Sequence, residues 1–302
     1  MRIAYQGEPG AYSEAAALRF KPDVDLKPCE TFDEVFAAVE TGKATHGILP
    51  IENSVGGSIH RNYDLLLEHE LPIVAEVEYK IVHHLLAHPE SRIEDIKRIY
   101  SHPQALAQCE HFLRSLRQME VVATYDTAGS AKMIREGGLR DAAAIASERA
   151  AQVFTLAILQ SAIQDFDDNI TRFIIIARSA VPLGEPDKTT VVFTPTRNEP
   201  GGLFKALSVF ALRDIDLTKL ESRPIRGRPW EYMFYVDLAI GREDLRCSRA
   251  LVQLAEFARS LRTLGSYPSW KARDASTEPH EGDASVSSAA HGAAERGERE
   301  SR

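Results

Sequence analysis

The stretch "DDNITRFIIIARS", residues 167–179, places an amide, a hydroxyl and a guanidinium directly before a run of apolar, mostly β-branched residues. The three polar side chains are Asn169, Thr171 and Arg172. Strand propensity alone would account for Thr171, and Arg172 could be a surface ion-pair partner. All three side chains, however, can donate hydrogen bonds to an anion. Their combination at the start of a predicted strand favours a functional site.

A second polar group follows the apolar stretch of "GILPIENSVGGSI". Glu52, Asn53 and Ser54 present a carboxylate, an amide and a hydroxyl at the end of a predicted strand. The pair Gly56–Gly57 would let a ligand approach the backbone closely. A helix N-cap on a glycine-containing loop is the alternative interpretation, and we favour a binding site.

Two further segments bear polar side chains near predicted helix starts. In "QGEPGAYSE" a Gly/Pro loop precedes Ser13, and an anion cradle and an ordinary turn remain equally open interpretations. In "SHPQALAQC" helix capping fully explains Ser101, with Pro103 in the first turn. Gln108 lies two helical turns further on, on the same face as Ser101.

Histidines and cysteines give no metal-binding pattern. Cys29, Cys109 and Cys247 are far apart and show neither zinc-ligand spacing nor a disulfide framework. The histidines near these loops lack matching ligands and are expected to be solvated: His83, His84, His88 and His102. The sequence therefore predicts no metal site.

Composition narrows the range of partners and locations. The 302 residues have a formal net charge of -8 and a pI near 5.7, which argues against nucleic acid and against an anionic membrane surface. No apolar run approaches the roughly 20 residues that span a bilayer, and no leader segment is evident. Unpaired cysteines favour a reducing compartment. We therefore expect a cytoplasmic protein that binds a small molecule or another protein.

Short apolar runs alternate with amphipathic stretches over the first 180 residues, which predicts an α/β domain with a largely parallel sheet. In such sheets ligands bind at the carboxyl ends of the strands, where the polar groups described above are expected to lie. The predicted strands are Ile3–Gln6, Leu26–Cys29, His46–Pro50, Ile73–Val77, Ile99–Ser101, Val121–Thr124, Ala143–Ala146 and Phe173–Ala177.

The rest of the chain has a different organisation. "SAVPLGEPDK" contains the predicted linker, residues 181–187, and residues 188–268 show the order βαββαβ of a ferredoxin-like module. Its second helix is predicted to extend over residues 245–264. Gly201–Gly202 at a helix start and Glu221-Ser222 at a strand end suggest a small-molecule site shared between subunits. Residues 269–302 are expected to be a disordered tail.

Taken in order, these motifs resemble the prephenate dehydratase family with a C-terminal ACT domain. The matching segments are "GEPGAYSE", "LPIENSVGGSI", "SHPQALAQC", "DTAGSA", "AAIAS", "NITRF", "GLFKALSVF" and "ESRP". The plant arogenate dehydratases, which share fold and chemistry, are similar too. The resemblance implies a two-lobed catalytic domain like a type II periplasmic binding protein, residues 1–180. Lobe one would be residues 1–80 plus 170–180, lobe two residues 81–169, and the ACT domain residues 188–268.

The implied reaction is the decarboxylative dehydration of prephenate to phenylpyruvate in L-phenylalanine biosynthesis. The family motif makes Thr171 the proton donor to the leaving hydroxyl, and no cofactor is implied. A carboxylate at Glu52 is unexpected beside a dianionic substrate, unless it orients other groups or is neutral. The resemblance and the chemistry together imply a catalytic set of Thr171, Glu52, Asn53, Ser101 and Gln108, and a substrate-binding set of Arg172, Ser13, Thr127, Ser54 and Asn169.

The ACT resemblance implies feedback inhibition by L-phenylalanine, bound between two ACT domains of a homodimer or homotetramer. The residues that would bind this effector are Gly201, Gly202, Leu203, Ala206, Glu221, Ser222 and Arg223. Two alternatives stay open: an arogenate dehydratase, which an acidic group in the cleft would favour, and a non-catalytic protein that binds a small anion.

Overall fold

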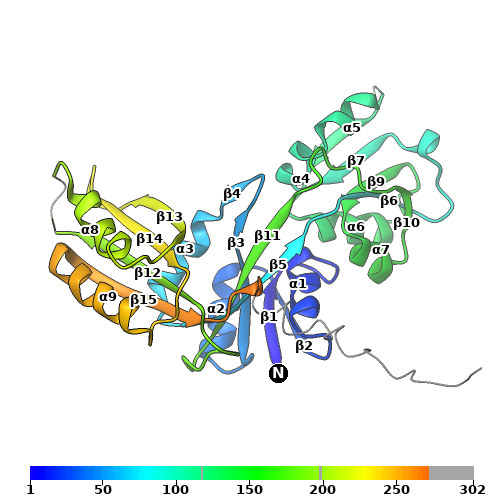
Figure 1. Ribbon diagram of the computed structural model, residues 1–302. Helices are drawn as coiled ribbons and strands as arrows, with labels where there is room; N and C mark the ends of the chain where they lie inside the picture. The colour runs from blue at the N-terminus through cyan, green and yellow to red at the C-terminus, as the bar shows by residue number, and fades with distance from the viewer. Residues whose placement is uncertain (117, 197–198, 272–302) are drawn as a thin grey trace, which may run out of the picture.

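The computed structural model describes residues 1–116, 118–196 and 199–271 (Figure 1). Two sheets organise this part of the chain. A ten-stranded sheet has the order β13-β14-β12-β15-β5-β11-β3-β1-β2, with β4 paired to β3, and a five-stranded sheet has the order β10-β6-β9-β7-β8. In Figure 1 the second sheet lies to the right, and only β5 and β11 extend toward it from the first. No helix in the described ranges is long and apolar enough to cross a membrane.

Lobe one contains the central strands of the large sheet. Strand β1 is parallel to β2 and β3, whereas β11 is antiparallel to both β3 and β5. Strands β1, β2, β3 and β5 therefore run in one direction, as the predicted largely parallel sheet requires, and β11 is the exception because it returns from lobe two against its neighbours. The elements are β1 (Arg2–Gln6), α1 (Tyr12–Phe20), β2 (Asp25–Cys29), α2 (Phe32–Glu40), β3 (His46–Asn53), β4 (Gly57–Ser58), α3 (His60–Glu68), β5 (Ile73–Lys80) and β11 (Ile170–Ala177).

Lobe two is inserted between β5 and β11. Its sheet is mixed, since β7 is parallel to β8 and β9 while β6 is antiparallel to β9 and β10. Strands β6 and β10 were not predicted, because neither "HLLA" nor "AILQ" alternates between apolar and polar residues. The elements are β6 (His84–Ala87), η1 (Ile93–Asp95), β7 (Arg98–Ser101), α4 (Pro103–Ala107), α5 (Glu110–Ser115), β8 (Glu120–Ala123), α6 (Thr127–Glu136), β9 (Ala142–Ala146), α7 (Glu148–Phe154) and β10 (Ala157–Gln160).

The C-terminal module has the predicted order of strands and helices. Its elements are β12 (Lys188–Pro195), α8 (Gly202–Ala211), β13 (Leu217–Pro224), β14 (Tyr232–Leu238), α9 (Leu245–Phe257) and β15 (Ala258–Tyr267). Both helices pack on one face of the sheet, through a buried cluster that includes Phe193, Phe210 and Leu254. The predicted length of the second helix is wrong: α9 ends at Phe257, because the next ten residues pair with β12 as strand β15.

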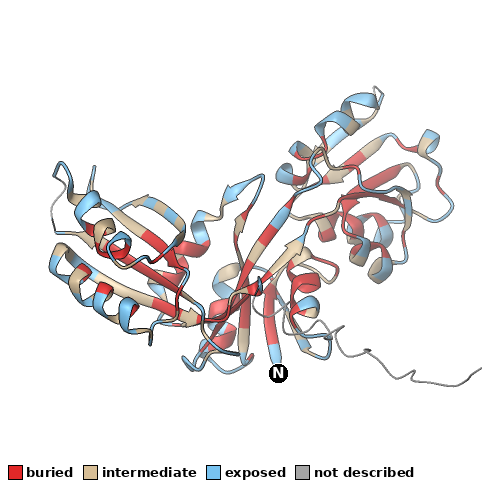
Figure 2. Cartoon of the chain, in the orientation of Figure 1, coloured by how far each residue is buried: buried red, intermediate tan, exposed pale blue. Residues whose placement is uncertain are grey.

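The other face of this module packs against lobe one. Val192 and Tyr235 of the module belong to the same buried cluster as Phe36 and Leu66 of lobe one. The strands of the module and of lobe one also join edge to edge within the ten-stranded sheet, where Gly265 of β15 pairs with Ile73 of β5. A Cβ atom at Gly265 would lie 2.2 Å from the Ile73 carbonyl oxygen, so this approach requires glycine. Figure 2 shows buried residues along the strands and exposed ones on the outer faces of α8 and α9.

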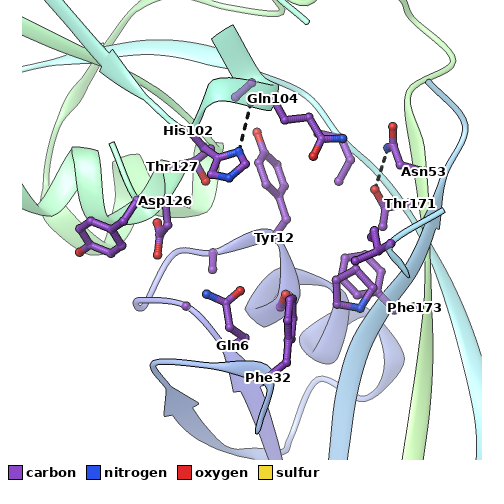
Figure 3. Close-up of a pocket in the computed structure, with 18 of the residues that line it drawn as sticks. Gln6, Tyr12, Phe32, Asn53, His102, Gln104, Asp126, Thr127, Thr171 and Phe173 are labelled. Carbon is purple, nitrogen blue, oxygen red and sulfur yellow. Dashed lines mark hydrogen bonds between the residues drawn. The ribbon is translucent and has the colours of Figure 1, made fainter. Parts of the chain in front are cut away.

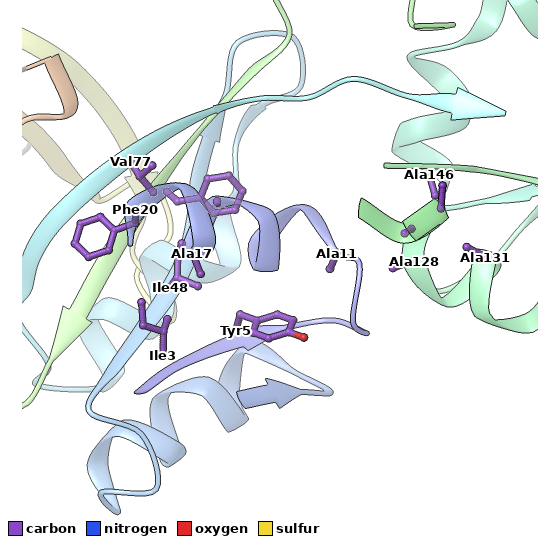
Figure 4. Close-up of a cluster of buried hydrophobic side chains, with 14 of the residues drawn as sticks. Ile3, Tyr5, Ala11, Ala17, Phe20, Ile48, Val77, Ala128, Ala131 and Ala146 are labelled. Atoms are coloured by element: carbon purple, nitrogen blue, oxygen red, sulfur yellow. The ribbon is translucent and has the colours of Figure 1, made fainter. Parts of the chain in front are cut away.

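The two lobes touch through the loop that follows β1. Gly10 has φ +93°, and a Cβ atom there would lie 2.7 Å from the Ala150 Cα, so only glycine fits. The Ser147 hydroxyl donates to the Gly10 carbonyl oxygen at 2.6 Å. Figure 4 shows Ala11 between Tyr5 of lobe one and the small alanine side chains of lobe two. These contacts fix the distance between the lobes at the floor of the cleft.

The predicted tail includes residues that pack against lobe one. Trp270 is 9% exposed, and its backbone N–H donates to Glu76 Oε1 at 3.0 Å, whereas Lys271 is exposed. The apolar surface of this indole explains why the chain stays attached beyond β15. The rest of the predicted tail, residues 272–302, lies outside the described residues.

Candidate active site

A cavity of about 560 Å³ lies between the two lobes (Figure 3). Lobe one contributes residues of β1, β3, β11, α1 and α2, and lobe two contributes the first turns of α4 and α6. Its apolar wall includes Phe32, Pro50, Ile81 and Phe173, which suits a small carbocyclic ring. The polar lining residues include Ser13, Asn53, Gln108, Thr127 and Thr171, all of which were predicted from the sequence.

Asn53 and Thr171 form the centre of this site. They are directly paired across β3 and β11, and the Asn53 Nδ2 atom donates to the Thr171 Oγ1 atom at 2.8 Å. Each residue is 6% exposed. Since an amide nitrogen has no lone pair to accept, the Thr171 hydroxyl proton points elsewhere. No acceptor for that proton occurs among the described residues, so it is available to a ligand in the cleft.

Backbone contacts fix the direction of this hydrogen bond. The Asn53 Oδ1 atom accepts from the backbone N–H groups of Val55 and Gly56 at 3.1 and 2.6 Å, which leaves Nδ2 as the donor toward Thr171. Asn53 Nδ2 also donates to Asn169 Oδ1 at 2.7 Å, and Asn169 Nδ2 donates to Gln108 Oε1 at 3.0 Å. Asn169 is 1% exposed and therefore acts on the neighbouring amides rather than on a ligand.

The row of amides ends at a buried histidine. His83 Nε2 lies 2.9 Å from Gln108 Oε1, and since that oxygen only accepts, Nε2 must donate. The Tyr12 hydroxyl lies 2.8 Å from both His83 Nδ1 and the Val82 carbonyl oxygen. Burial lowers the pKa of His83, although its hydrogen bond to Gln108 opposes this shift. The neutral Nε2–H form, which satisfies the row, is therefore favoured.

Anion binding in this cleft cannot use lysine or arginine, because neither occurs among its described lining residues. The first turn of α1 faces the cavity, and its N-cap, Ala11, offers no side-chain hydrogen bond. Backbone N–H groups there, together with the Ser13 and Thr127 hydroxyls, can receive a carboxylate. Carboxylates also line the cavity, at Glu30, Asp33 and Asp126.

Five predicted site residues do not line this cavity, and one of them is the buried Asn169 described above. The Ser101 side chain is fully buried and donates to the Ile145 carbonyl oxygen at 2.6 Å, while His102 rather than Ser101 caps α4. Glu52, Ser54 and Arg172 point to the other side of the sheet, where they line a second cavity. Strand alternation explains this, since their neighbours Asn53 and Thr171 face the cleft. The predicted roles of Arg172 as an anion clamp and of Glu52 in the cleft are therefore corrected.

Several lining residues were missed from the sequence. Tyr12 stands next to Ser13 in the motif that was singled out, so its place at the start of α1 was the available signal. His83 was expected to be solvated and is only 2% exposed, and His84 is 8% exposed, so that expectation is wrong for both. Spacing alone could not reveal that a short, unpredicted strand follows His83 and holds it at the cleft.

The predicted effector residues lie on two faces of the C-terminal module. Gly201 caps α8 with φ +79°, Gly202 and Leu203 form its first turn, and Ala206 is buried beneath it. The side chains of Glu221 and Arg223 instead face lobe one, where they contact Ser58 and Asp64 respectively. Ser222 pairs with Phe234 and so shares the helix-covered face. Within one chain, therefore, these residues do not form a common pocket.

The fold and the cleft define an α/β protein that holds a small molecule between two lobes. A sequence model described as prephenate dehydratase matches residues 3–181. Arogenate dehydratase/prephenate dehydratase 2, chloroplastic, of Arabidopsis thaliana is 51% identical over 279 residues, which cover 89% of this chain and 73% of that protein. Arogenate dehydratase 2 of Petunia hybrida is 51% identical over 285 residues, covering 89% and 72%.

Two solved structures are similar over nearly the whole described chain. Prephenate dehydratase of Arthrobacter aurescens in complex with L-Phe is 33% identical, with a TM-score of 0.82 over 90% of this chain and 91% of that one. A protein described as a novel type of quorum-quenching acylase is 37% identical, with a TM-score of 0.81 over 89% and 98%.

The chain therefore belongs to the prephenate dehydratase family. The resemblance seen in the sequence is confirmed, and so are the predicted enzyme class, a carbon–oxygen lyase, and the dehydratase reaction of phenylalanine biosynthesis. The prediction of a cytoplasmic location is contradicted, because similar proteins are named as chloroplast proteins. Unpaired cysteines indicate reducing conditions and do not identify a compartment.

Proposed function

We propose that the cleft catalyses the decarboxylative dehydration of prephenate, with Thr171 as the proton donor. The observation that supports this assignment is the directed hydrogen bond from Asn53 to Thr171, which leaves the hydroxyl proton facing the cavity. The bond also draws electron density from the Thr171 oxygen and strengthens a weak acid. A non-catalytic binding site would have no need of such an arrangement.

The chemistry requires one proton at the leaving hydroxyl of the substrate. As the bond between the ring and its carboxylate breaks, the electron pair enters the ring and CO2 departs. The ring hydroxyl leaves as water with the proton from Thr171, which regains one from solvent. Phe32 and Phe173 supply apolar surface for the ring, which becomes aromatic in this step. Positioned donors of this kind contribute about 10²- to 10⁴-fold to a rate.

We assign substrate carboxylate binding to the start of α1, with help from Ser13 and Thr127. The dipole of α1 and its unsatisfied N–H groups favour an anion there. Gln108 and Asn169 hold Asn53, and through it Thr171, in place by hydrogen bonds. In this assignment no metal or organic cofactor takes part.

The direct test is an assay of the purified protein on prephenate and on arogenate in parallel. Prephenate should be converted to phenylpyruvate with loss of CO2. Heat-inactivated protein is the control for the spontaneous, acid-promoted reaction. Absence of enzymatic turnover on both compounds would contradict the dehydratase assignment.

Arogenate is the second candidate substrate, because the described lining of the cavity has carboxylates and contains no lysine or arginine. Its side chain carries an ammonium group that Glu30 could attract. In the same assay, Glu30→Gln should then lower kcat/KM for arogenate and leave the value for prephenate unchanged or higher. Equal effects on both substrates would exclude Glu30 as the ammonium partner.

We further propose that the C-terminal module is an ACT domain that binds L-phenylalanine between two copies. Phe204 on α8 and Leu220 on β13 are 76% and 44% exposed, and both lie on the helix-covered side of the module. Pairing of two chains would cover these apolar side chains and bring Gly201 and Ser222 of different copies together. The same contact would make a homodimer or part of a homotetramer.

Calorimetry should therefore detect L-phenylalanine binding at millimolar concentration. Phe204→Glu places a charge in the proposed contact, so it should reduce the molar mass in light scattering and abolish binding at once. Glu256→Gln is the control. It changes a charge on the exposed side of α9 and leaves the residues of α8 unaltered. A monomer that binds the effector normally would contradict the shared site.

A further inference from the structure

Each of the two central active-site residues has a charged neighbour on the opposite side of the sheet. Glu52 precedes Asn53 on β3, and Arg172 follows Thr171 on β11. Glu52 and Arg172 are directly paired across the two strands, as Asn53 and Thr171 are. Alternation therefore gives the sheet a catalytic face toward the cleft and a charged face away from it.

Both charges are neutralised by residues of the C-terminal module. Arg172 Nη2 lies 2.7 Å from Asp237 Oδ2 on β14, and Glu52 Oε1 lies 2.8 Å from Lys219 Nζ on β13. Lys219 and Asp237 are themselves direct partners across β13 and β14. The four side chains thus form a square of alternating charge between the two parts of the molecule, and Glu52 and Arg172 complete it at 3.6 Å.

This square is largely shielded from water. The side chains of Lys219, Asp237 and Arg172 are 7%, 4% and 11% exposed, and Glu52 is 38% exposed. Burial alone would raise the pKa of Asp237, but the nearby Arg172 outweighs it, so the pKa lies below its usual value. Removal of one partner would leave an uncompensated charge in a largely buried interface, which changes the local geometry.

A second anchor holds Arg172 from lobe one. Glu76 on β5 is 1% exposed and accepts from Arg172 Nη1 at 3.1 Å. The other oxygen of Glu76 contacts Lys188 of β12 and the Trp270 backbone N–H. The guanidinium is therefore held between β14 of the C-terminal module and β5 of lobe one. A displacement of this group would act on β11, the strand to which Thr171 belongs.

Strand β13 also connects this square to the predicted effector motif. Glu221 follows Lys219 by two residues, on the same face, and accepts from Ser58 at 2.9 Å. Lys219 also donates to Ser58, at 3.0 Å. Ser58 belongs to β4, which pairs with Glu52 and Asn53. A shift of β13 would therefore reach the active-site strand through side chains in direct contact.

On the basis of the proposed function, we infer that Glu52 and Arg172 are positioning residues through which the C-terminal module sets the geometry of Asn53 and Thr171. Lys219 and Asp237 are their partners in the module. Neither pair touches the substrate cavity. The rate of the reaction therefore depends on ion pairs that lie on the far side of the sheet from the substrate.

Variants of the module side test this inference without alteration of the cleft. Lys219→Gln and Asp237→Asn should each lower kcat for prephenate about tenfold, with KM within twofold, because small displacements of a donor weaken catalysis far more than binding. Inhibition by L-phenylalanine should weaken in parallel. Arg226→Gln is the matched control, since Arg226 also bonds from the module to lobe one, at Asp64, but has no active-site neighbour. It should leave kcat unchanged.

A double-mutant cycle separates positioning from general stabilisation of the interface. Glu52→Gln combined with Lys219→Gln should lower kcat no more than either change alone, because both break one link. Glu52→Gln combined with Arg226→Gln should give independent effects. Wild-type kcat in both Lys219→Gln and Asp237→Asn would overturn the inference, even if both variants melt at a lower temperature.

Amide hydrogen exchange supplies a readout that needs no substrate. Asp237→Asn should accelerate exchange in residues 170–173, at the start of β11, and leave residues 174–177 protected. Unchanged exchange at the start of β11 would overturn the inference whatever the substrate proves to be. If instead exchange responds but the wild-type protein converts neither prephenate nor arogenate, the proposed function is wrong. The coupling between the C-terminal module and the start of β11 is then still supported.

Discussion

Replacement of Thr171 by valine should lower kcat for prephenate by about 10²- to 10⁴-fold, the range that a positioned proton donor contributes. Valine keeps the β-branched shape that suits strand β11, so the change removes the hydroxyl and little else. KM should change less, because in the proposed assignment the carboxylates of the substrate bind elsewhere, at the start of α1. Steady-state kinetics at saturating substrate measure the effect directly.

Serine at the same position is the matched control for Thr171→Val. It restores an oxygen that can accept from Asn53 Nδ2, so Thr171→Ser should recover most of the activity. In the valine variant that amide proton loses its acceptor in a buried site, which costs about 1–3 kcal/mol. Thermal unfolding of both variants reports this separately from catalysis. A valine variant within a few-fold of wild-type kcat would remove the proton-donor role.

Local sequence patterns were sufficient to predict most of the strands and the polar positions at their ends. Apolar runs such as "GILPI" and "RFIIIA" correspond to β3 and β11, and the βαββαβ order of the module follows from turns and helical periodicity. These features depend on neighbouring residues only, so a single chain contains the necessary signal. The direction of β11 cannot be predicted in this way, because it depends on where the chain re-enters the sheet after lobe two.

The side of a strand that faces the ligand was the main source of error. Asn53 and Thr171 line the cleft, whereas Glu52 and Arg172, which were grouped with them because they are adjacent in sequence, do not. Both are charged, and both seemed suited to a charged substrate. Their actual partners, Lys219 and Asp237, belong to a module that begins over a hundred residues after β3. Such distant partners leave no trace in local patterns.

The position of His83 shows the same limit for a neutral residue. Neither its spacing nor its neighbours indicate that it ends a row of buried amides that begins at Thr171. The row is assembled from β11, β3, the end of α4 and the segment before β6. Its direction comes from two backbone N–H groups in the loop after Asn53, so we expect this loop to affect catalysis although neither Val55 nor Gly56 lines the cavity.

The direction of the hydrogen bond from Asn53 to Thr171 predicts a second large effect on kcat, for the variant Asn53→Asp. The change is nearly isosteric, but it replaces the Nδ2 donor with an oxygen that can only accept when ionised. The other carboxylate oxygen would still accept from Val55 and Gly56, as Oδ1 does now. Thr171 would then donate its proton to the new carboxylate and no longer present it to the cleft. We expect kcat to fall by about two orders of magnitude, within the range for loss of a positioned donor.

Two further results are expected of Asn53→Asp if it acts through the direction of this hydrogen bond. Activity should rise again as the pH is lowered, because the protonated carboxyl group can donate to Thr171 Oγ1 as the amide does, and Asn53→Leu should show no such recovery. In the Thr171→Val background, Asn53→Asp should have little additional effect on kcat, since the hydroxyl that it redirects is absent. Fully multiplicative losses in the double variant would show that Asn53 acts on the substrate itself and not through Thr171.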